Sequence, residues 1–185
     1  MTFDINEFSA SINRYGIAKA ENFSMNVNCP GGVANDEREL MMRIETTDLP
    51  GRDVVMYESN YNGLSYKIAK DSLIADVNIQ ILLSEKFQEK EYMERWQDLA
   101  IGSYRNGQIN KNMFNLNYYK KYVGTVVIQQ YDETGQVTYT CKLVDAFPKT
   151  IGAIQNSWDN STTLLKLPVT ITYRYYVIEK ERIES

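Results

Sequence analysis

Residues 75–102 read ADVNIQILLSEKFQEKEYMERWQDLAIG, and two residue patterns with different periods meet in this stretch. Its first part, from Asp76 to Leu83, alternates apolar and polar residues, which predicts a β-strand with one buried face. Its second part carries apolar residues three and four positions apart, namely Tyr92, Trp96, Leu99 and Ala100. That spacing predicts an amphipathic helix, which Ser84 can cap at its start and Gly102 can end. A strand therefore leads directly into a helix.

More strands are expected before this stretch. Residues 21–29 alternate in the same way, and their apolar members are Phe23, Met25, Val27 and Cys29. Pro30-Gly31-Gly32 closes that strand. Residues 40–46 and 52–58 also have the character of strands, and Asp48-Leu49-Pro50-Gly51 forms a turn between them. Asn60-Tyr61-Asn62-Gly63 marks a second turn.

The last third of the chain is rich in strand patterns. Residues 123–131 and 137–143 predict a hairpin whose turn is Asp132-Glu133-Thr134-Gly135. A segment without a repeat follows, from Phe147-Pro148 to Asn160. Apolar or aromatic residues then occupy odd positions from Leu165 to Val177, which predicts one unusually long final strand. Such a strand exceeds the span of a small sandwich, so part of it is available to pair outside the domain.

The whole chain, residues 1–185, reads as a single domain with three irregular parts. Residues 1–19 form an N-terminal arm, and residues 2–13 fit a short amphipathic helix or an arm docked on the body equally well. Residues 103–117 carry six Asn or Gln residues and predict a surface loop. Residues 178–185 form a charged C-terminal tail. The fold class expected from these patterns is mainly β, an antiparallel sandwich or barrel with one flanking helix.

Composition excludes several classes of function. The chain has 185 residues, a net charge of −4 and no histidine. Without histidine there is no Ser-His-Asp unit and no imidazole metal ligand. The two cysteines, Cys29 and Cys141, show no pairing pattern and are expected to be buried thiols. No targeting segment and no apolar run long enough to span a bilayer is present, so a soluble cytoplasmic product is expected.

No motif in the chain points to catalysis or to a cofactor. Dinucleotide-binding, phosphate-loop, CxxC and HExxH patterns are absent, and Gly31-Gly32 fits a plain turn. Tyr173, Tyr175 and Tyr176 could stack on single-stranded nucleic acid, but no basic cluster accompanies them. We therefore assign no catalytic, cofactor-binding or metal-binding residues, and we expect no enzyme.

The order of features along the chain resembles the tail tube proteins of contractile-tailed bacteriophages of the T-even type. The resemblance covers roughly residues 20–178. It begins at the turn of Leu49-Pro50 and continues with ADVNIQILL and EYMERWQDLAIG, in which Trp96 precedes Ala100-Ile101. Tyr119-Lys120 and the hairpin VVIQQYDETGQVTYTCKL follow. The closing segments AFPKTIGAIQNSWDNST and LPVTITYRYYVIE are the most specific part.

This resemblance implies a structural subunit of the phage tail inner tube. Strands of neighbouring subunits would join into a ring barrel, and stacked hexameric rings would form the conduit for DNA ejection. The implied partners are the chain itself, the tail sheath protein, the baseplate tube initiator and the tape-measure protein. DNA would pass through the lumen without specific binding, and no membrane is involved. The expected location is the tail tube of the virion, assembled in the host cytoplasm.

Three alternatives stay open at this point. A baseplate- or neck-proximal tube initiator or terminator shares the implied fold, and so does the tube protein of a type VI secretion system. A nucleic-acid-binding β-barrel belongs to a different class and would need basic residues interleaved with aromatics. Two segments, Asp48–Gly63 and Ser103–Asn117, are expected to carry contacts between rings or with the sheath, since long polar loops are usually functional.

Overall fold

The computed structural model describes residues 5, 9–10, 16–30, 37–61, 63–102, 104–105, 108–109, 116–154, 156 and 164–179. The helices are α2 (Glu37–Met42), α3 (Gln88–Ile101) and the short 3-10 helix η1 (Tyr119–Lys121). The strands are β1 (Phe23–Asn28), β2 (Ile44–Thr47), β3 (Arg52–Tyr61), β4 (Leu64–Ile74), β5 (Val77–Leu82), β6 (Tyr104–Arg105), β7 (Gln108–Ile109), β8 (Gly124–Tyr131), β9 (Val137–Ile151), β10 (Lys166–Thr172) and β11 (Tyr175–Glu179). The protein is mainly β, as the sequence predicts.

Two antiparallel sheets share one long strand. Sheet A consists of β1, β8, the first part of β9 and β11, and sheet B consists of the last part of β9, β10, β5 and β2. The strand order along the path is β1-β8-β9-β10-β5-β2, and β11 pairs with β9 beside it. In the described part of the chain, β1 and β2 end this path without pairing with each other.

The two sheets meet at a corner in β9. Asp145 adopts a positive φ of 55° there, and the register of β8 with β9 shifts by one residue at the same level. Thr172 pairs with Phe147 on one side of the corner, and Tyr175 pairs with Val144 on the other side. The prediction of one continuous strand from Leu165 to Val177 is therefore wrong. The chain breaks into β10 and β11 because it leaves sheet B and enters sheet A where β9 bends.

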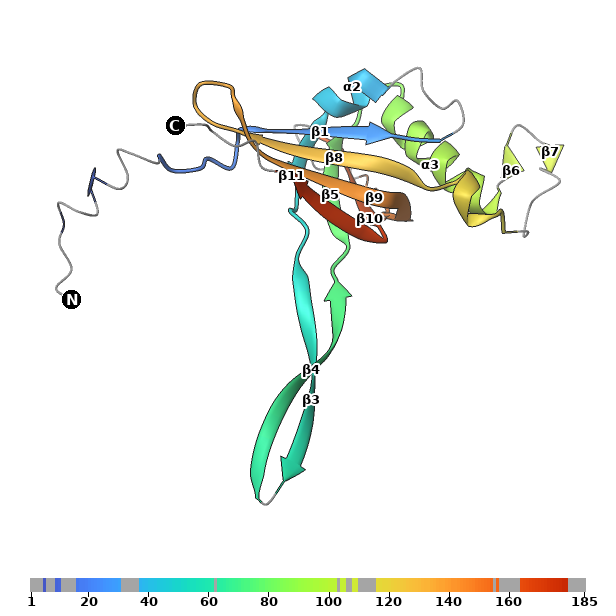
Figure 1. Ribbon diagram of the computed structural model, residues 1–185. Helices are drawn as coiled ribbons and strands as arrows, with labels where there is room; N and C mark the ends of the chain where they lie inside the picture. The colour runs from blue at the N-terminus through green and yellow to red at the C-terminus, as the bar shows by residue number, and fades with distance from the viewer. Residues whose placement is uncertain are drawn as a thin grey trace.

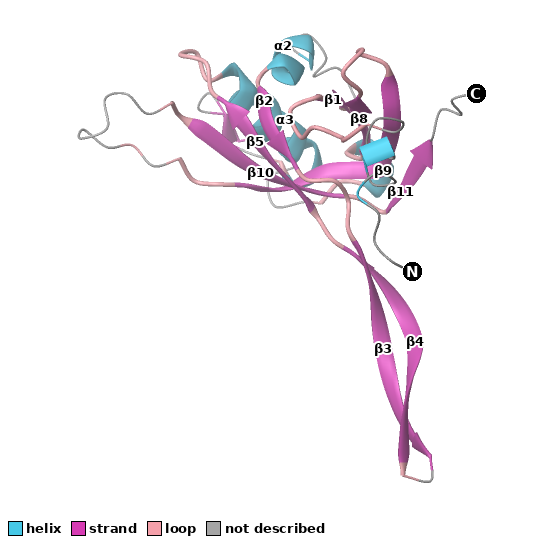
Figure 2. Ribbon diagram, turned by 90° about the vertical axis from the view of Figure 1, so that its left-hand side faces the viewer, coloured by secondary structure: helices cyan, strands magenta, loops and turns pink. Residues whose placement is uncertain are grey.

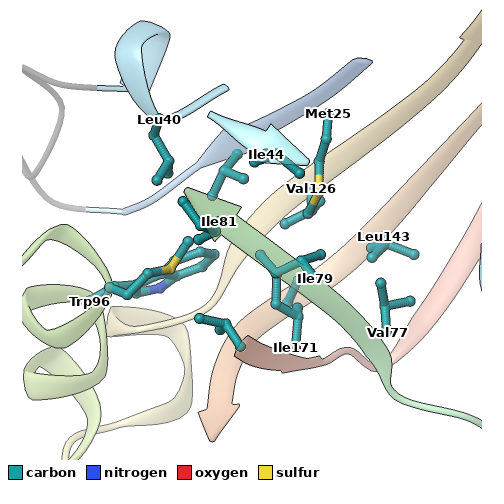
Figure 3. Close-up of a cluster of buried hydrophobic side chains, with 14 of the residues drawn as sticks. Met25, Leu40, Ile44, Val77, Ile79, Ile81, Trp96, Val126, Leu143 and Ile171 are labelled. Atoms are coloured by element: carbon teal, nitrogen blue, oxygen red, sulfur yellow. The ribbon is translucent and has the colours of Figure 1, made fainter. Parts of the chain in front are cut away.

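The core lies between the sheets and is closed by α3 (Figures 1 and 3). The alternating residues of the strands point into it, and Val77, Ile79 and Ile81 of β5 are each at most 1% exposed. From α3, Tyr92, Met93 and Trp96 are buried. The Trp96 indole Nε1 donates a hydrogen bond to the Tyr122 carbonyl over 2.8 Å. The helix that the sequence predicts is thus an anchor of the core. Both cysteines are buried thiols that form no disulfide.

The start of α3 differs from the prediction. Ser84 does not cap the helix, because the helix begins at Gln88 and its N-cap position is Phe87, with φ of 55°. Instead of accepting a hydrogen bond from the first turn of the helix, Ser84 donates two. Its N–H and its hydroxyl both donate to the buried carboxylate of Glu89, in the first turn. The end of the helix is as predicted. Gly102 has φ of 67°, and its N–H donates to the Asp98 carbonyl.

Three other boundaries need correction. Residues 40–46 do not form one strand, because α2 continues to Met42 and β2 begins at Ile44. Residues 147–151 belong to β9 and are not irregular, since they pair with β10. No strand is predicted directly after Gly63, but the structure has β4 at Leu64–Ile74. By contrast, β1, β5 and the β8–β9 hairpin with its turn at Gly135 agree with the predicted strands.

Several predictions fall partly or wholly outside the described residues. The N-terminal arm is described only at residues 5, 9–10 and 16–19, and the tail only at 178–179. The turn of Trp158-Asp159-Asn160 lies outside the described ranges. Within the predicted loop 103–117, the structure describes the two-residue strands β6 and β7, which pair with each other, and residues 116–117.

Candidate assembly surfaces

A long hairpin projects from the body of the protein. Strands β3 and β4 pair over their whole length and make a two-stranded sheet, which no other strand joins in the described residues (Figures 1 and 2). They continue from β2 and lead into β5, so the hairpin is an extension of the edge of sheet B. A two-stranded hairpin is marginally stable in water by itself. Its exposed apolar side chains make it a candidate contact surface.

The two faces of this hairpin are chemically different. Directly paired residues share a face, so Tyr57 with Ile68 and Ser59 with Tyr66 lie on one side. Val55 and Leu73 belong to the same side by register, together with their partners Asp71 and Asp53, and we call this side the aromatic face. Tyr57 is 58% exposed and Ile68 is 54% exposed.

The opposite side of the hairpin, which we call the polar face, carries charged contacts. Glu58 pairs with Lys67 over 3.8 Å, and Arg52 Nε donates a hydrogen bond to Ser72 Oγ. Val54 and Met56 also lie on this face, and Met56 is 58% exposed. The aromatic face thus carries tyrosines and two carboxylates, whereas the polar face carries side chains of both charges and no aromatic residue. Both faces present apolar side chains of similar exposure.

A second candidate contact is strand β11, which lies at the edge of sheet A. In the described residues it pairs with β9 alone, so its other edge presents free backbone groups. Its exposed apolar side chains are Tyr175, Val177 and Ile178, which are 40–46% exposed. Open strand edges with apolar side chains are pairing sites for another chain.

A groove of about 710 Å³ lies at the base of the hairpin. Its lining includes the apolar side chains of Phe23 and Ile128 and the carboxylates of Glu45, Asp48 and Asp76. Burial raises the pKa of the Asp76 carboxyl, but hydrogen bonds from Lys149 and Thr172 outweigh burial and leave that pKa below its usual value. These carboxylates are held in local contacts, which is a structural use of the groups and not an arrangement for acid–base chemistry.

No cofactor site emerges from the described residues. The chain has no histidine, and in the ranges that the structure describes no three Asp, Glu or Cys side chains gather as a metal site. No helix in those ranges is both long and apolar enough to cross a membrane. Burial raises the pKa of the Cys141 thiol to about 11, so this thiol is a poor nucleophile. The surfaces that stand out are those for contact with other chains.

Sequence reasoning located part of these surfaces. The expected contact segment Asp48–Gly63 coincides with β3 and the tip of the hairpin, but the returning strand was missed. The signal for β4 is present, since Leu64, Tyr66 and Ile68 alternate directly after an Asn-Gly turn. Lys70 and Asp71 interrupt the alternation at the level where the register of the hairpin shifts.

The phage tail tube protein family matches residues 3–179 of the sequence. The chain belongs to the phage tail tube protein family. Its mainly β fold with one main helix agrees with that membership, and its role is therefore structural, in a tail tube. No curated protein matches the sequence.

Solved structures of contractile injection systems have the same fold as this tail tube protein. A chain from the sheath/tube terminator of an extracellular contractile injection system (PVC) aligns with a TM-score of 0.61 and 12% identity, covering 88% of this chain and 96% of the other. A chain from the PVC sheath-tube complex gives 0.59 and 11%, covering 97% and 100%. A chain from the baseplate of the anti-feeding prophage gives 0.59 and 12%, covering 90% and 98%. At these identities the likeness concerns the fold.

Proposed function

We propose that this tail tube protein is the repeating subunit of the inner tube of a contractile phage tail. Six copies close into a ring, rings stack into a tube, and DNA passes through the tube during ejection. Family membership supports the tube, and fold relatives from contractile injection systems support the contractile type of tail. The observation that carries the proposal is the β3–β4 hairpin, whose exposed aromatic face lacks any cover within the described chain.

The energetics of the hairpin favour contact with another subunit. Val55, Tyr57, Tyr66, Ile68 and Leu73 are each 41–59% exposed. Covering such side chains stabilises a contact by about 25 cal/mol for each Å² of apolar surface removed from water. An apolar patch of this kind on a soluble protein typically marks an interaction site. A stacked ring supplies a second copy of the chain as the cover.

Open strand edges supply the contacts within a ring. β1, β2 and β11 each pair on one side only in the described part of the chain. A head-to-tail contact between unlike surfaces generates a closed ring when the rotation between subunits divides a full turn. Closure of the ring removes the open edges, so the sheets of the subunits continue into one barrel.

The remaining partners follow from this position. The outside of the tube contacts the tail sheath protein, its lower end meets the baseplate tube initiator, and its lumen holds the tape-measure protein before DNA enters. The protein therefore resides in the virion tail after assembly in the host cytoplasm. The predicted loop Ser103–Asn117 is a further contact between rings or with the sheath. Deleting residues 106–112 is expected to leave the fold intact and to impair stacking, and normal tubes from this variant would contradict that role.

Self-assembly is the direct test of the proposal. Native mass spectrometry at high protein concentration is expected to detect hexamers, and negative-stain images are expected to show rings or tubes of uniform diameter. The measurement is repeated with purified baseplates, which nucleate tubes from subunits that stay monomeric alone. Monomers under both conditions would contradict the proposal.

A tube initiator or terminator is the second candidate, because fold relatives come from a sheath/tube terminator and from a baseplate. The length of the assembly separates the two functions. A main tube subunit adds to the end of an existing tube many times, whereas an initiator or terminator stops after one ring. Tube length measured against added protein therefore decides between them.

A further inference from the structure

Large exposed apolar side chains gather in three places on the described chain. Two of these places are the hairpin and β11, which we assign to subunit contacts. The third lies where α3 ends and η1 begins, and we call it the η1 patch. Its apolar side chains, each 41–82% exposed, are Ile101, Leu116, Tyr118 and Tyr119. An apolar cluster of this kind on a protein surface typically marks an interaction site.

Hydrogen bonds and ring contacts hold the η1 patch together. The Asn117 N–H donates to the Ala100 carbonyl over 3.0 Å, and Asn117 Nδ2 donates to the Leu99 carbonyl over 2.7 Å. These bonds place the two neighbours of Asn117, which are Leu116 and Tyr118, beside the end of α3. The patch is therefore formed before any partner arrives, and binding orders few further groups.

Two lysines give the η1 patch a positive charge. Lys120 and Lys121 are the only adjacent basic residues in the sequence, and both are exposed. Neither forms an ion pair in the described residues. Lys121 Nζ lies 6.0 Å from the centroid of the Tyr118 ring, which leaves its charge without a carboxylate. The patch thus combines aromatic side chains with two uncompensated positive charges.

The aromatic face of the hairpin carries charges of the opposite sign. Asp53 and Asp71 lie on this face by register, and neither forms an ion pair in the described residues. Lys70, next to Asp71 in the bulge of β4, offsets one of these charges at most. The aromatic face therefore combines exposed tyrosines with an excess of negative charge.

The other two apolar surfaces are less complementary to the η1 patch. On the polar face of the hairpin, Glu58 is already paired with Lys67 over 3.8 Å, and Arg52 adds a positive charge. β11 brings one charge of each sign, namely Glu179 and, opposite Val177, Lys142. Among the exposed apolar surfaces of the described chain, the aromatic face thus fits the patch best in charge.

We propose that the η1 patch of one subunit binds the aromatic face of the hairpin of a second copy, with Lys120 and Lys121 opposite Asp53 and Asp71. The hairpin projects away from the end of α3 (Figure 1), so a subunit cannot cover its own hairpin with its own patch. This inference rests on the proposed tube function and names the surface that covers the hairpin. Two unlike surfaces of one chain then meet head-to-tail, and the opposite charges fix their register.

Two charge-reversed variants test this contact. The patch variant is Lys120→Glu/Lys121→Glu, and the hairpin variant is Asp53→Lys/Asp71→Lys. Each variant alone places like charges on both sides of every contact. The protein concentration needed for half-maximal assembly, measured by sedimentation, is therefore expected to rise by roughly tenfold or more.

An equimolar mixture of the two variants is expected to assemble near the wild-type concentration. In alternating contacts, the glutamates of a reversed patch meet the lysines of a reversed hairpin, and each remaining contact joins native lysines to native aspartates. A single chain with all four changes is expected to assemble for the same reason. Rescue by opposite charges separates a direct contact from a general effect of the substitutions on the subunit.

Arg38→Glu/Lys86→Glu is the matched control. Both residues are exposed and lie outside the three apolar surfaces, and the double change alters the net charge as much as the patch variant does. This control is expected to assemble like the wild type. Urea unfolding of each monomer checks that every variant keeps its fold.

Normal assembly of either reversed variant alone would overturn the proposal. So would two defective variants that neither the mixture nor the fourfold change rescues. Normal tubes of the patch variant that fail to bind purified sheath protein would also overturn it, because the patch would then serve the sheath. Failure of the wild-type protein to form rings or tubes, with and without baseplates, is a separate outcome that contradicts the tube function itself.

Discussion

Glu89 is a buried carboxylate, only 3% exposed, and both of its oxygens are occupied. One oxygen accepts hydrogen bonds from the N–H and the hydroxyl of Ser84, and the other lies 3.0 Å from Arg43 Nε. Burial raises the pKa of this carboxyl, but the Ser84 hydrogen bonds and Arg43 outweigh burial, so the pKa lies below its usual value. This network joins the end of α2 to the beginning of α3.

Replacing Glu89 by Gln is expected to lower the free energy of unfolding by about 1–3 kcal/mol at neutral pH. The amide keeps one acceptor oxygen, but its NH2 group then faces a donor, either Ser84 or Arg43, and the charge opposite Arg43 is lost. Since the folded-state pKa is lower than that of the unfolded chain, the carboxylate stabilises the fold above the unfolded-state pKa. That stability is lost as the pH falls through the folded-state pKa. Urea unfolding of the wild type and the variant should therefore converge in acid. Glu91→Gln, which removes an exposed ion pair with Arg95, is the control and should cost no more than about 0.5 kcal/mol.

Gly124 lies where an added side chain would clash with the backbone of a neighbouring strand. A Cβ atom there would lie 2.3 Å from the Asn28 carbonyl oxygen and 2.9 Å from Trp96 Cζ2. Because the first of these is a backbone atom, Gly124→Ala must push β1 away from β8. We expect a loss of about 1–3 kcal/mol in thermal or urea unfolding. Gly51→Ala, whose Cβ would meet only the Ala75 Cβ at 3.8 Å, should change stability little. Equal effects in both variants would contradict this reading of the contact.

At the scale of elements, the two faces of the β3–β4 hairpin allow a matched comparison. Tyr57→Ser and Ile68→Ser change the aromatic face, and Met56→Ser changes the polar face at the same exposure as Tyr57. The first two are expected to weaken ring or tube formation by roughly tenfold or more each, from about 1.5 kcal/mol of lost apolar burial. Sedimentation of assembled protein against concentration measures this effect.

The control for this comparison is the monomer itself. Unfolding of all three variants should match the wild type, because these side chains contact little of the body. Met56→Ser should assemble normally, since the polar face stays in water. Equal loss of assembly from both faces would indicate that the hairpin inserts between two subunits and is covered on both sides.

Most elements could be predicted from the sequence because their residues alternate or repeat locally. β5 and α3 are examples, since Val77, Ile79 and Ile81 and then Tyr92 and Trp96 follow the periods of strand and helix. The break between β10 and β11 could not be predicted, because it depends on the bend at Asp145 in a distant strand. The candidate contact surfaces, the hairpin and β11, could be predicted only in part. Which face of the hairpin is aromatic depends on the β4 register, and the sequence does not reveal cross-strand partners.

For the whole molecule, we expect weak DNA binding without sequence preference. Net charge is −4, and Lys149 and Lys166 on sheet B are paired with carboxylates. A filter-binding assay with wild-type tubes at about 0.1 M salt should show no stable complex. Sub-micromolar affinity with a steep salt dependence would instead favour the nucleic-acid-binding barrel.

The distance in sequence between paired strands determines the order in which they can pair during synthesis of the chain. β3 and β4 are neighbours in sequence, so their hairpin can close as soon as Ile74 has left the ribosome. β5 can pair with β2 as soon as both are made, but its pairing with β10 must wait, because Val77 pairs with Ile171, and β1 must wait for β8. In the nascent chain, the hairpin and its exposed apolar side chains therefore form before the two sheets are complete.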